Sequence, residues 1–260
     1  MSDASKKDRT SGSRIAVIEK AVRVMDAVLR SPEGMTPTEV AAAVQTNRST
    51  AFRLLTSLEH AGLMTRDADG GRYRLGPRLL QYGEVVRAGM TIIDVADPTM
   101  RWLRDETRQS VLLSVREGWG ARCIHRLAGP EVDVLSWATG ELLPMHVGAA
   151  PQALLSSLSD AELERYLAHG GDWHTLHGVR TASDIRDGVQ QIRRQGWALN
   201  REGLTLGVAS LGAVIKDRSG ISVCALSVAG LEHHYLGDEL KRTADRVLKA
   251  AEEIRARLSG

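Results

Sequence analysis

The feature of this sequence that most restricts its fold is a closely punctuated segment over residues 36–75. Thr36 is followed at once by Pro37 and, three residues after Thr36, by Glu39. A hydroxyl residue at the N-cap, a proline at the first helical position and a glutamate at the third form a capping box. The pattern therefore predicts a short helix over about 37–44.

A second helix and a hairpin follow directly. Asn47 is suited to cap a helix over about 48–60, and Gly62 is suited to end it. Two short runs, 63–66 and 72–75, then flank a loop rich in Asp and Gly, which indicates a β-hairpin. With an apolar helical pattern upstream, from residue 14 to about 29, this is the element order of a winged helix-turn-helix, and we assign it to residues 14–76.

Composition sets wider limits. The chain has 260 residues, of which 43% are hydrophobic and 25% charged, as in ordinary globular proteins of one or two domains. No apolar run reaches the roughly 18–20 residues of a membrane-spanning helix, and residues 1–14 have no apolar core typical of a secretory signal. The cysteines, Cys123 and Cys224, are far apart and predict reduced, buried thiols. We therefore expect a cytoplasmic protein without membrane contact.

Charge is unevenly distributed. The net charge is +2, but residues 1–90 contain 14 Lys and Arg against 10 Asp and Glu, so the remaining 170 residues are slightly acidic. Residues 1–13 lack periodicity and read as a disordered basic arm. We expect its basic residues to follow a DNA backbone or minor groove. The basic residues of the arm are Lys6, Lys7 and Arg9, and Arg14 directly follows the arm.

The rest of the chain alternates helices and strands. Residues 77–96 predict a linker helix, and Pro98 should interrupt it before another helix that ends near residue 109. Strands are predicted at 111–115, 122–126, 132–135, 208–215 and 222–228. Helices are predicted at 151–158, 160–168, 184–195 and 236–258, with Ser159 and Ser183 as caps of the second and third. Residues 97–260 thus form a second, α+β domain.

The second helix of a helix-turn-helix enters the major groove with its N-terminal residues on base edges. The apolar positions of the helix over 48–60 should face inward, which leaves polar side chains on the opposite face. Arginine is suited to bidentate contact with guanine, and two arginines on one strand of the wing should contact phosphates. The predicted DNA-binding residues are Arg48, Ser49, Thr50, Arg53, Thr56, Arg72 and Arg74.

Several stretches of the chain carry motifs typical of one protein family. In the first domain they are Ile18–Met25, Thr36–Ala41, Arg48–Leu55, Leu58–Leu63 and Arg72–Gly76. In the second domain they are Leu143–His146, Gly196–Ala198, Gly207–Ser210 and Ala225–Gly230. In these stretches the sequence closely resembles the IclR family of bacterial transcriptional regulators, and the resemblance covers about residues 14–258.

The resemblance implies a GAF-like effector-binding and oligomerisation domain, a repressor of a catabolic or metabolic operon, and no enzymatic activity, cofactor or metal. Partners would be palindromic operator DNA, a small carboxylate or related aromatic metabolite, and further copies of the chain as a homodimer or dimer of dimers. Carried over position by position, the effector-binding residues are Gly148, Ala149, Asn200, Val208, Ser210 and Ser227.

Two departures from the family pattern bear on the ligand. Pro151-Gln152 stands where the family usually has Gly-Lys, which removes a positive charge, and Asn200 stands where an acid is common. The sequence leaves the sign of regulation open, because an activator would share every feature above. A sensor or enzyme that uses the helix-turn-helix for protein contacts is a further alternative. The candidates for metal ligands are the histidines at 169, 174, 177, 233 and 234.

Overall fold

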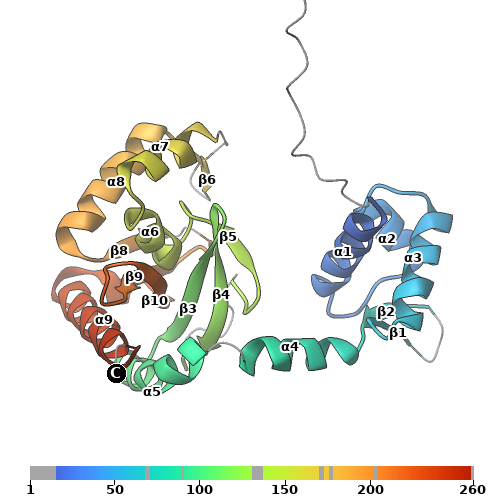
Figure 1. The fold of residues 1–260 in the computed structure, drawn as a ribbon, viewed down its shortest axis with the longest axis horizontal. Coiled ribbons are helices and arrows are strands. Elements are labelled where there is room, and N and C mark those ends of the chain that lie inside the picture. Colours follow the sequence, from blue (N-terminus) through green and yellow to red (C-terminus); the bar gives the residue numbers. More distant parts are fainter. Residues whose placement is uncertain are drawn as a thin grey trace, which may run out of the picture. The chain divides into compact units, whose positions relative to one another are not determined.

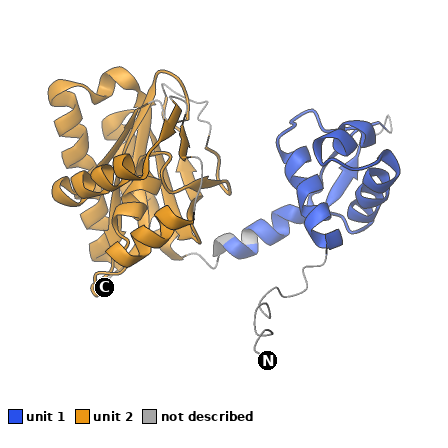
Figure 2. Cartoon of the chain, turned by 90° about the horizontal axis from the view of Figure 1, so that it is seen from above, with its two compact units in different colours: residues 1–89 blue, residues 90–260 orange. Residues whose placement is uncertain are grey.

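The computed structural model describes residues 16–67, 71–88, 91–130, 137–169, 173–175, 178–201 and 204–258. It divides into two compact units, residues 1–89 and 90–260 (Figure 2). Three predictions lie outside the described residues: the arm over 1–13 with Arg14, the strand over 132–135, and His177.

The described part of unit 1 contains three helices, a hairpin and a fourth helix. Figure 1 labels these elements. The elements are α1 (Ala16–Leu29), α2 (Pro37–Ala43), α3 (Arg48–His60), β1 (Met64–Arg66), β2 (Tyr73–Leu75) and α4 (Arg78–Ala88). The two strands pair antiparallel, with Thr65 opposite Arg74. The predicted winged helix-turn-helix order is confirmed.

The local signals act as predicted in unit 1. The Thr36 hydroxyl accepts from the Glu39 amide at 3.3 Å, and the Glu39 carboxylate accepts from the Thr36 amide at 2.7 Å. The Asn47 side chain accepts from the Thr50 amide at 2.7 Å and so starts α3. Gly62, with φ of +74°, ends α3 in a conformation that side chains with a Cβ rarely adopt.

Unit 2 is built on a six-stranded antiparallel sheet with strand order β5-β4-β3-β10-β9-β8. The strands are β3 (Ser110–Glu117), β4 (Gly120–Leu127), β5 (Leu142–Pro144), β8 (Ala198–Arg201), β9 (Val208–Lys216) and β10 (Ser222–Leu231). A separate small hairpin consists of β6 (Trp173–Thr175) and β7 (Gly178–Arg180).

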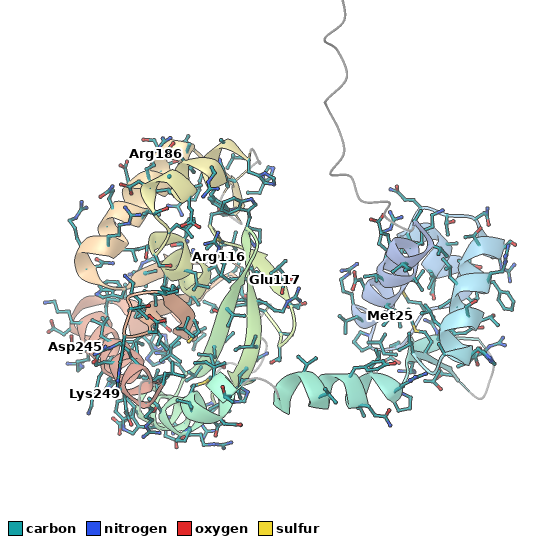
Figure 3. All side chains as sticks on the ribbon, viewed as in Figure 1. Met25, Arg116, Glu117, Arg186, Asp245 and Lys249 are labelled. Atoms are coloured by element: carbon teal, nitrogen blue, oxygen red, sulfur yellow. The ribbon has the colours of Figure 1, made fainter. Side chains whose placement is uncertain are left out.

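Helices cover both faces of this sheet (Figure 1). One face packs against α5 (Thr91–Thr107) and α9 (Gly237–Leu258). Lys249, labelled in Figure 3, belongs to α9, and its Nζ lies 5.1 Å from the centre of the Trp102 ring of α5. The other face packs against α6 (Ala149–Ser156), α7 (Asp160–Ala168) and α8 (Ala182–Gln195), and a 3₁₀ turn, η1 (Glu232–Tyr235), precedes α9. Side chains alternate along a strand. Leu211 of β9 is therefore buried on the face that packs against α5 and α9, while Ser210 and Gly212 face α6.

Two predictions around the unit boundary are wrong. Pro98 does not interrupt the chain, because α5 runs through it from Thr91 to Thr107. Ile93 and Ala96 before the proline and Met100 after it are buried in the core of unit 2, and this packing outweighs the backbone hydrogen bond that proline removes. Residues 91–96 therefore belong to unit 2 rather than to a linker helix over 77–96.

Other differences concern caps and short strands. The N-cap of α8 is Thr181 and not Ser183, because Thr181 and Asp184 exchange two hydrogen bonds, at 2.7 and 3.1 Å, in a capping box. The Ser159 cap of α7 is confirmed. Helix α6 begins at Ala149, two residues before the predicted start. The strands β5, β6, β7 and β8, each of three or four residues, were not predicted. No helix within the described ranges combines the length and apolar character needed to cross a bilayer.

Candidate DNA-binding and effector sites

Packing in unit 1 fixes which face of α3 is exposed. Ala51, Leu54, Leu55 and Leu58 are buried against Val24 of α1 and side chains of α2 and the hairpin. Since these four positions occupy one side of the helix, the side chains between them face outward. The core therefore presents α3 in a fixed rotation.

The predicted base-contacting residues of α3 lie on that outward side. Arg48, Ser49, Arg53 and Thr56 are exposed, and Thr50 is half-buried. Neither Arg48 nor Arg53 forms an ion pair within the part of the chain that the structure describes. Two uncommitted guanidinium groups on one exposed helix face can donate bidentate hydrogen bonds to an external acceptor.

Two further residues of this surface were not predicted. Phe52, the chain's single phenylalanine, is 45% exposed and lies one turn after Arg48 and one turn before Thr56. Its i, i+4 spacing from both is a signal that was present in the sequence. Lys20 of α1 borders a hollow of about 280 Å³ together with Thr50 and Arg53, and its place beside α3 depends on tertiary packing that the sequence does not reveal.

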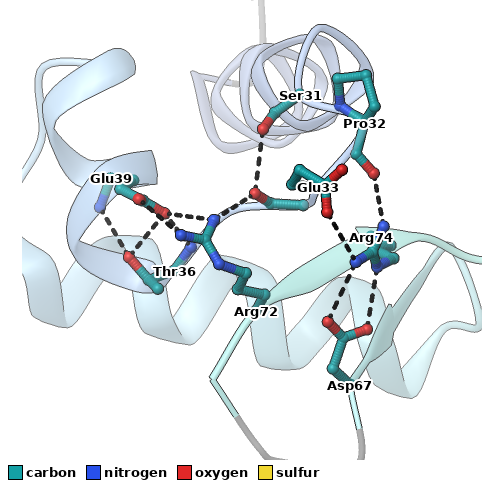
Figure 4. Close-up of polar contacts among 9 residues, drawn as sticks. Ser31, Pro32, Glu33, Thr36, Glu39, Asp67, Arg72 and Arg74 are labelled. Atoms are coloured by element: carbon teal, nitrogen blue, oxygen red, sulfur yellow. Dashed lines mark hydrogen bonds and ion pairs between the residues drawn. The ribbon is translucent and has the colours of Figure 1, made fainter.

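Arg72 and Arg74 of the wing are held by partners within unit 1 (Figure 4). Arg72 donates to the Gly34 carbonyl at 2.8 Å and to both carboxylate oxygens of Glu39 at 3.2 Å. Hydrogen bonds from the Thr36 backbone and hydroxyl, together with the Arg72 charge, lower the pKa of Glu39. One carboxylate therefore both caps α2 and fastens α2 to the wing.

Arg74, two residues after Arg72, is also held by partners within unit 1. Its Nε donates to Asp67 at 3.0 Å and its Nη1 to the Pro32 carbonyl at 2.5 Å, while Glu33 lies 3.9 Å from Nη2 (Figure 4). The Asp67 hydrogen bond and charge raise the pKa of Arg74. Both guanidinium groups face the loop between α1 and α2, so their role as phosphate contacts stays a prediction, and their visible role is to brace the wing.

In unit 2, all six predicted effector residues line one cavity. Gly148 and Ala149 begin α6, Asn200 lies on β8, and Val208, Ser210 and Ser227 lie on β9 and β10. The cavity has a volume of about 40 Å³. Residues separated by up to 79 positions in sequence are thus brought together between the start of α6 and the sheet.

The approach of α6 to the sheet depends on Gly212. A Cβ at this position would lie 3.0 Å from the Ala150 nitrogen and 3.1 Å from both the Ala149 carbonyl carbon and the Leu226 oxygen. On the same strand face, the Ser210 hydroxyl accepts a hydrogen bond from the Ala149 amide at 3.3 Å. Close packing and one side-chain hydrogen bond therefore hold the N-terminus of α6 at the cavity.

The cavity is polar without being charged. No ionisable side chain is found among the described residues that line it. Gly148, the N-cap of α6, has φ of +87° and no side chain to cap the helix, and the positive end of the helix dipole lies at this cavity. The Ala149 amide is already used by the Ser210 hydroxyl. Pro151, at the third helical position, has no amide hydrogen and cannot donate. The site can hold a small anionic or strongly polar group through hydroxyls and the helix dipole.

Apolar lining residues complete the cavity and were not predicted. They include Leu112, Trp137, Leu204 and Ala229. The Trp137 indole donates to the Glu141 carbonyl at 3.0 Å, so its ring offers apolar surface rather than a free donor. The sequence carries no local signal for Trp137, which follows the run 132–135 that predicts a strand.

The candidate reactive groups outside this cavity are buried within the fold. Burial raises the pKa of Cys123 to about 11 and that of Cys224 to about 12, so both thiols are protonated at neutral pH. Burial also lowers the pKa of His146, whose Nδ1 lies 3.0 Å from the Tyr166 hydroxyl. Within the described residues, no three His, Cys, Asp or Glu side chains gather in a metal-binding group.

Both units match domains of one known protein family. Residues 17–68 match the IclR helix-turn-helix domain, and residues 85–256 match the C-terminal domain of the bacterial transcriptional regulator IclR. The chain belongs to the IclR family. This is a family of DNA-binding transcriptional regulators, not of enzymes, so the resemblance in the sequence is confirmed.

Individual IclR-family proteins match along nearly the whole chain. The HTH-type transcriptional regulator Rv1719 of Mycobacterium tuberculosis is 30% identical over 91% of this chain and 90% of its own length. The transcriptional repressor IclR of Escherichia coli is 22% identical over 93% of this chain and 89% of its own. The crystal structure of an IclR homolog complexed with 4-hydroxybenzoate, from Microbacterium hydrocarbonoxydans, shares the fold with a TM-score of 0.77, at 21% identity over 93% and 98% of the two chains.

Proposed function

We propose that this IclR-family regulator is a cytoplasmic repressor whose affinity for its operator is controlled by a small organic acid bound in unit 2, a GAF-like domain. The observation that carries the proposal is the convergence of Gly148, Ala149, Asn200, Val208, Ser210 and Ser227 on one cavity at the start of α6. A concave site with a few convergent polar groups and apolar walls has the form of a ligand pocket. The repressor role is supported by the E. coli relative, which is named a transcriptional repressor.

We propose α3 as the reading helix. Arg48 and Arg53 are exposed without ion pairs in the described part of the chain, and Ser49, Thr50 and Thr56 lie beside them. Phe52 adds an exposed apolar edge to this face, suited to contact with a thymine methyl group. The wing arginines Arg72 and Arg74 would then contribute mainly by holding the wing against α2.

The position of the cavity at the N-terminus of α6 favours an acid as the ligand. A carboxylate at a helix N-terminus is stabilised by the helix dipole, and hydroxyl groups beside it can donate hydrogen bonds to the anion. The hydroxyls of Ser210 and Ser227 and the Asn200 amide would complete the polar contacts, and Trp137 and Leu204 the apolar ones. The solved relative with bound 4-hydroxybenzoate supports an aromatic acid, while the volume of about 40 Å³ favours a short one.

A second copy of the chain is the expected partner on palindromic DNA, because two-fold symmetry places one reading helix on each half-site. Solvent-exposed apolar side chains in unit 1 support a second copy as the partner. Leu80 and Val85 of α4 are 72% and 75% exposed, and Val17 and Ile18 of α1 are 58% and 57% exposed. A second copy of the chain could cover these apolar side chains. We propose a homodimer through these helices, with a dimer of dimers as the larger form.

Calorimetry with acetate, benzoate and 4-hydroxybenzoate tests the effector site. Wild-type protein is compared with Ser210→Ala and Ser227→Ala, and with Ser156→Ala as the control, since the Ser156 hydroxyl is buried but bonds the Ala153 carbonyl of its own helix at 2.7 Å. We expect removal of one hydroxyl to weaken binding of the preferred acid about 5- to 20-fold in the first two variants only. Equal affinities in all four proteins would remove this cavity as the effector site.

An activator is the second reading of the same site. The proteins would bind the same DNA and ligand, and only the position of the operator relative to the promoter would differ. In vitro transcription from a promoter that carries the selected operator decides between them: a repressor lowers transcript yield in the absence of ligand, and an activator raises it.

A further inference from the structure

A second and larger cavity lies along α8, next to the hairpin β6–β7 and the edge strand β8. Its volume is about 470 Å³, and Asn200 is the residue that it shares with the cavity at the start of α6. We call it the α8 groove and define it by Arg180, Gly188, Gln191, Gln195, Gln152 and Asn200, which are among its lining residues. The proposed effector site does not account for it.

Arg180 is the centre of this groove. It borders the α8 groove, an outer hollow of about 720 Å³ and an inner space of about 10 Å³ that reaches His146, and Gly188 borders the same three spaces. A Cβ at Gly188 would lie 3.7 Å from Nη2 of Arg180, so the guanidinium passes directly over this turn of α8. A longer side chain at 188 would occupy the space beside the guanidinium.

Arg180 has no ion pair among the described residues. Hydrogen bonds from Thr181 and, to a smaller extent, the charge of Arg180 lower the pKa of the exposed Asp184. Neighbouring arginines are paired: Arg193 with Asp160 at 2.6 Å, and Arg201 with Glu232 at 3.0 Å. Arg180 forms neither a side-chain hydrogen bond nor an ion pair with any residue that the structure describes. Asp184 and Asp187 border the outer hollow but not the α8 groove, whose described lining contains no carboxylate. A half-buried guanidinium at a groove whose described lining holds no acid attracts an anion.

The other polar groups of the groove are mostly amides. Gln152 donates through Nε2 to the His146 carbonyl at 3.0 Å, and Gln195 donates through Nε2 to the Trp197 carbonyl at 2.7 Å. Both amide oxygens therefore remain as acceptors, and Gln191 and Asn200 add two more amides. Amide acceptors near a guanidinium match a ligand that has hydroxyl donors as well as an anionic group.

We propose that the α8 groove is a second ligand site, for a small polyhydroxylated organic anion such as a sugar acid or a sugar phosphate. Arg180 binds the anionic group, and the amides of Gln152, Gln191 and Gln195 bind hydroxyl groups. The site is distinct from the proposed effector cavity, because Arg180 and Ser227 each line one of the two cavities and not the other.

Calorimetry on the full chain tests the site with gluconate, glucose 6-phosphate and glucose as probes. We expect gluconate or glucose 6-phosphate to bind, the stronger of the two identifying a carboxylate or a phosphate ligand, and glucose to bind at least about tenfold more weakly because it has no charge for Arg180. Arg180→Gln should weaken the anion at least about tenfold, since a charged hydrogen bond is replaced by a neutral one.

Controls separate a site from a general charge effect. Arg194→Gln also removes one positive charge, at a residue of α8 that borders the outer hollow but not the α8 groove. Ser227→Ala alters only the cavity at the start of α6. Both should bind the anion within about twofold of wild type. Gly188→Leu should abolish binding by filling the groove, with circular dichroism as the check that both groove variants are folded.

The proposal is overturned if neither anion binds wild-type protein at about 10 mM, if glucose binds as well as the anions, or if folded Arg180→Gln and Arg194→Gln lose equal affinity. The cavity at the start of α6, here called the α6 cavity, is tested separately with Ser210→Ala and Ser227→Ala. If that experiment excludes it as the effector site, the result for the α8 groove is unaffected.

Discussion

Replacing Arg53 by alanine tests the DNA-binding face of α3. Arg53 is exposed and forms no ion pair within the described residues, so its removal should leave unit 1 folded. The measured change in affinity then reports a contact to DNA and not a loss of structure. A bidentate arginine–guanine contact contributes about 1–3 kcal/mol, which corresponds to an increase in Kd of about 5- to 150-fold.

The assay is fluorescence anisotropy on an operator selected from random double-stranded DNA, at one fixed salt concentration, with an unrelated duplex in parallel. Arg53→Ala should lose affinity for the operator and change little on the unrelated duplex, because base contacts are specific and phosphate contacts are not. Arg72→Ala is the matched control: it removes the same charge from unit 1, but from a guanidinium that is already bound to Glu39 and the Gly34 carbonyl.

Three results would refute the reasoning. Unchanged operator affinity in Arg53→Ala would show that another face of α3 reads the DNA. Equal decreases in affinity on both duplexes would make Arg53 a phosphate contact. If Arg72→Ala, shown by circular dichroism to be folded, lost more operator affinity than Arg53→Ala, the wing and not α3 would carry recognition.

Further predictions concern the clamp, the cavity and the arm. The pKa of Glu39 is lowered by its Thr36 hydrogen bonds and by Arg72, so its stabilising effect is present above the usual value of 4.5 and is lost as the pH falls below it. The melting temperature of Glu39→Gln should therefore be below that of wild type at pH 7, and the difference should shrink below pH 4.5 when measured by differential scanning calorimetry; a difference independent of pH would contradict this origin. Gly212→Ala places a Cβ 3.0 Å from the Ala150 nitrogen and should destabilise the protein by about 1–3 kcal/mol, together with weaker acid binding, in urea unfolding and calorimetry. Wild-type behaviour of this variant would mean that α6 can withdraw from the sheet freely. Deleting residues 1–13 should reduce the slope of log Kd against log salt by about 1 for each phosphate that the arm neutralises, and an unchanged slope would exclude the arm from binding.

Elements with local signals could be predicted from the sequence. Thr36, Asn47 and Ser159 make their capping hydrogen bonds to residues three positions away, so their roles are visible in the sequence. Pro98 shows the limit of such signals. Its local preference to break a helix was outweighed by burial of Ile93 and Met100 in a core whose other residues include many that are more than a hundred positions away.

The candidate sites divide in the same way. The exposed face of α3 followed from helical periodicity, which is local. The partners of Arg72 and Arg74 did not: Glu39 precedes Arg72 by 33 residues, and Pro32 precedes Arg74 by 42. The six cavity residues came from the family resemblance and not from periodicity, and the structure brings them together on four elements and the turn that starts α6. Neither periodicity nor the family resemblance predicted Trp137 and Leu204 as cavity residues.

The central claim is that ligand in the α6 cavity and operator on α3 oppose each other in one molecule. Thermodynamic linkage requires the effect to be mutual: the factor by which ligand weakens operator binding must equal the factor by which operator weakens ligand binding. The most direct measurement is therefore a pair of titrations, operator affinity with and without the preferred acid and acid affinity with and without operator, on wild type and Ser227→Ala. We predict equal factors of about 5- to 150-fold in wild type, with higher acid concentrations needed for Ser227→Ala. An acid that binds the α6 cavity while operator affinity stays unchanged would contradict the account.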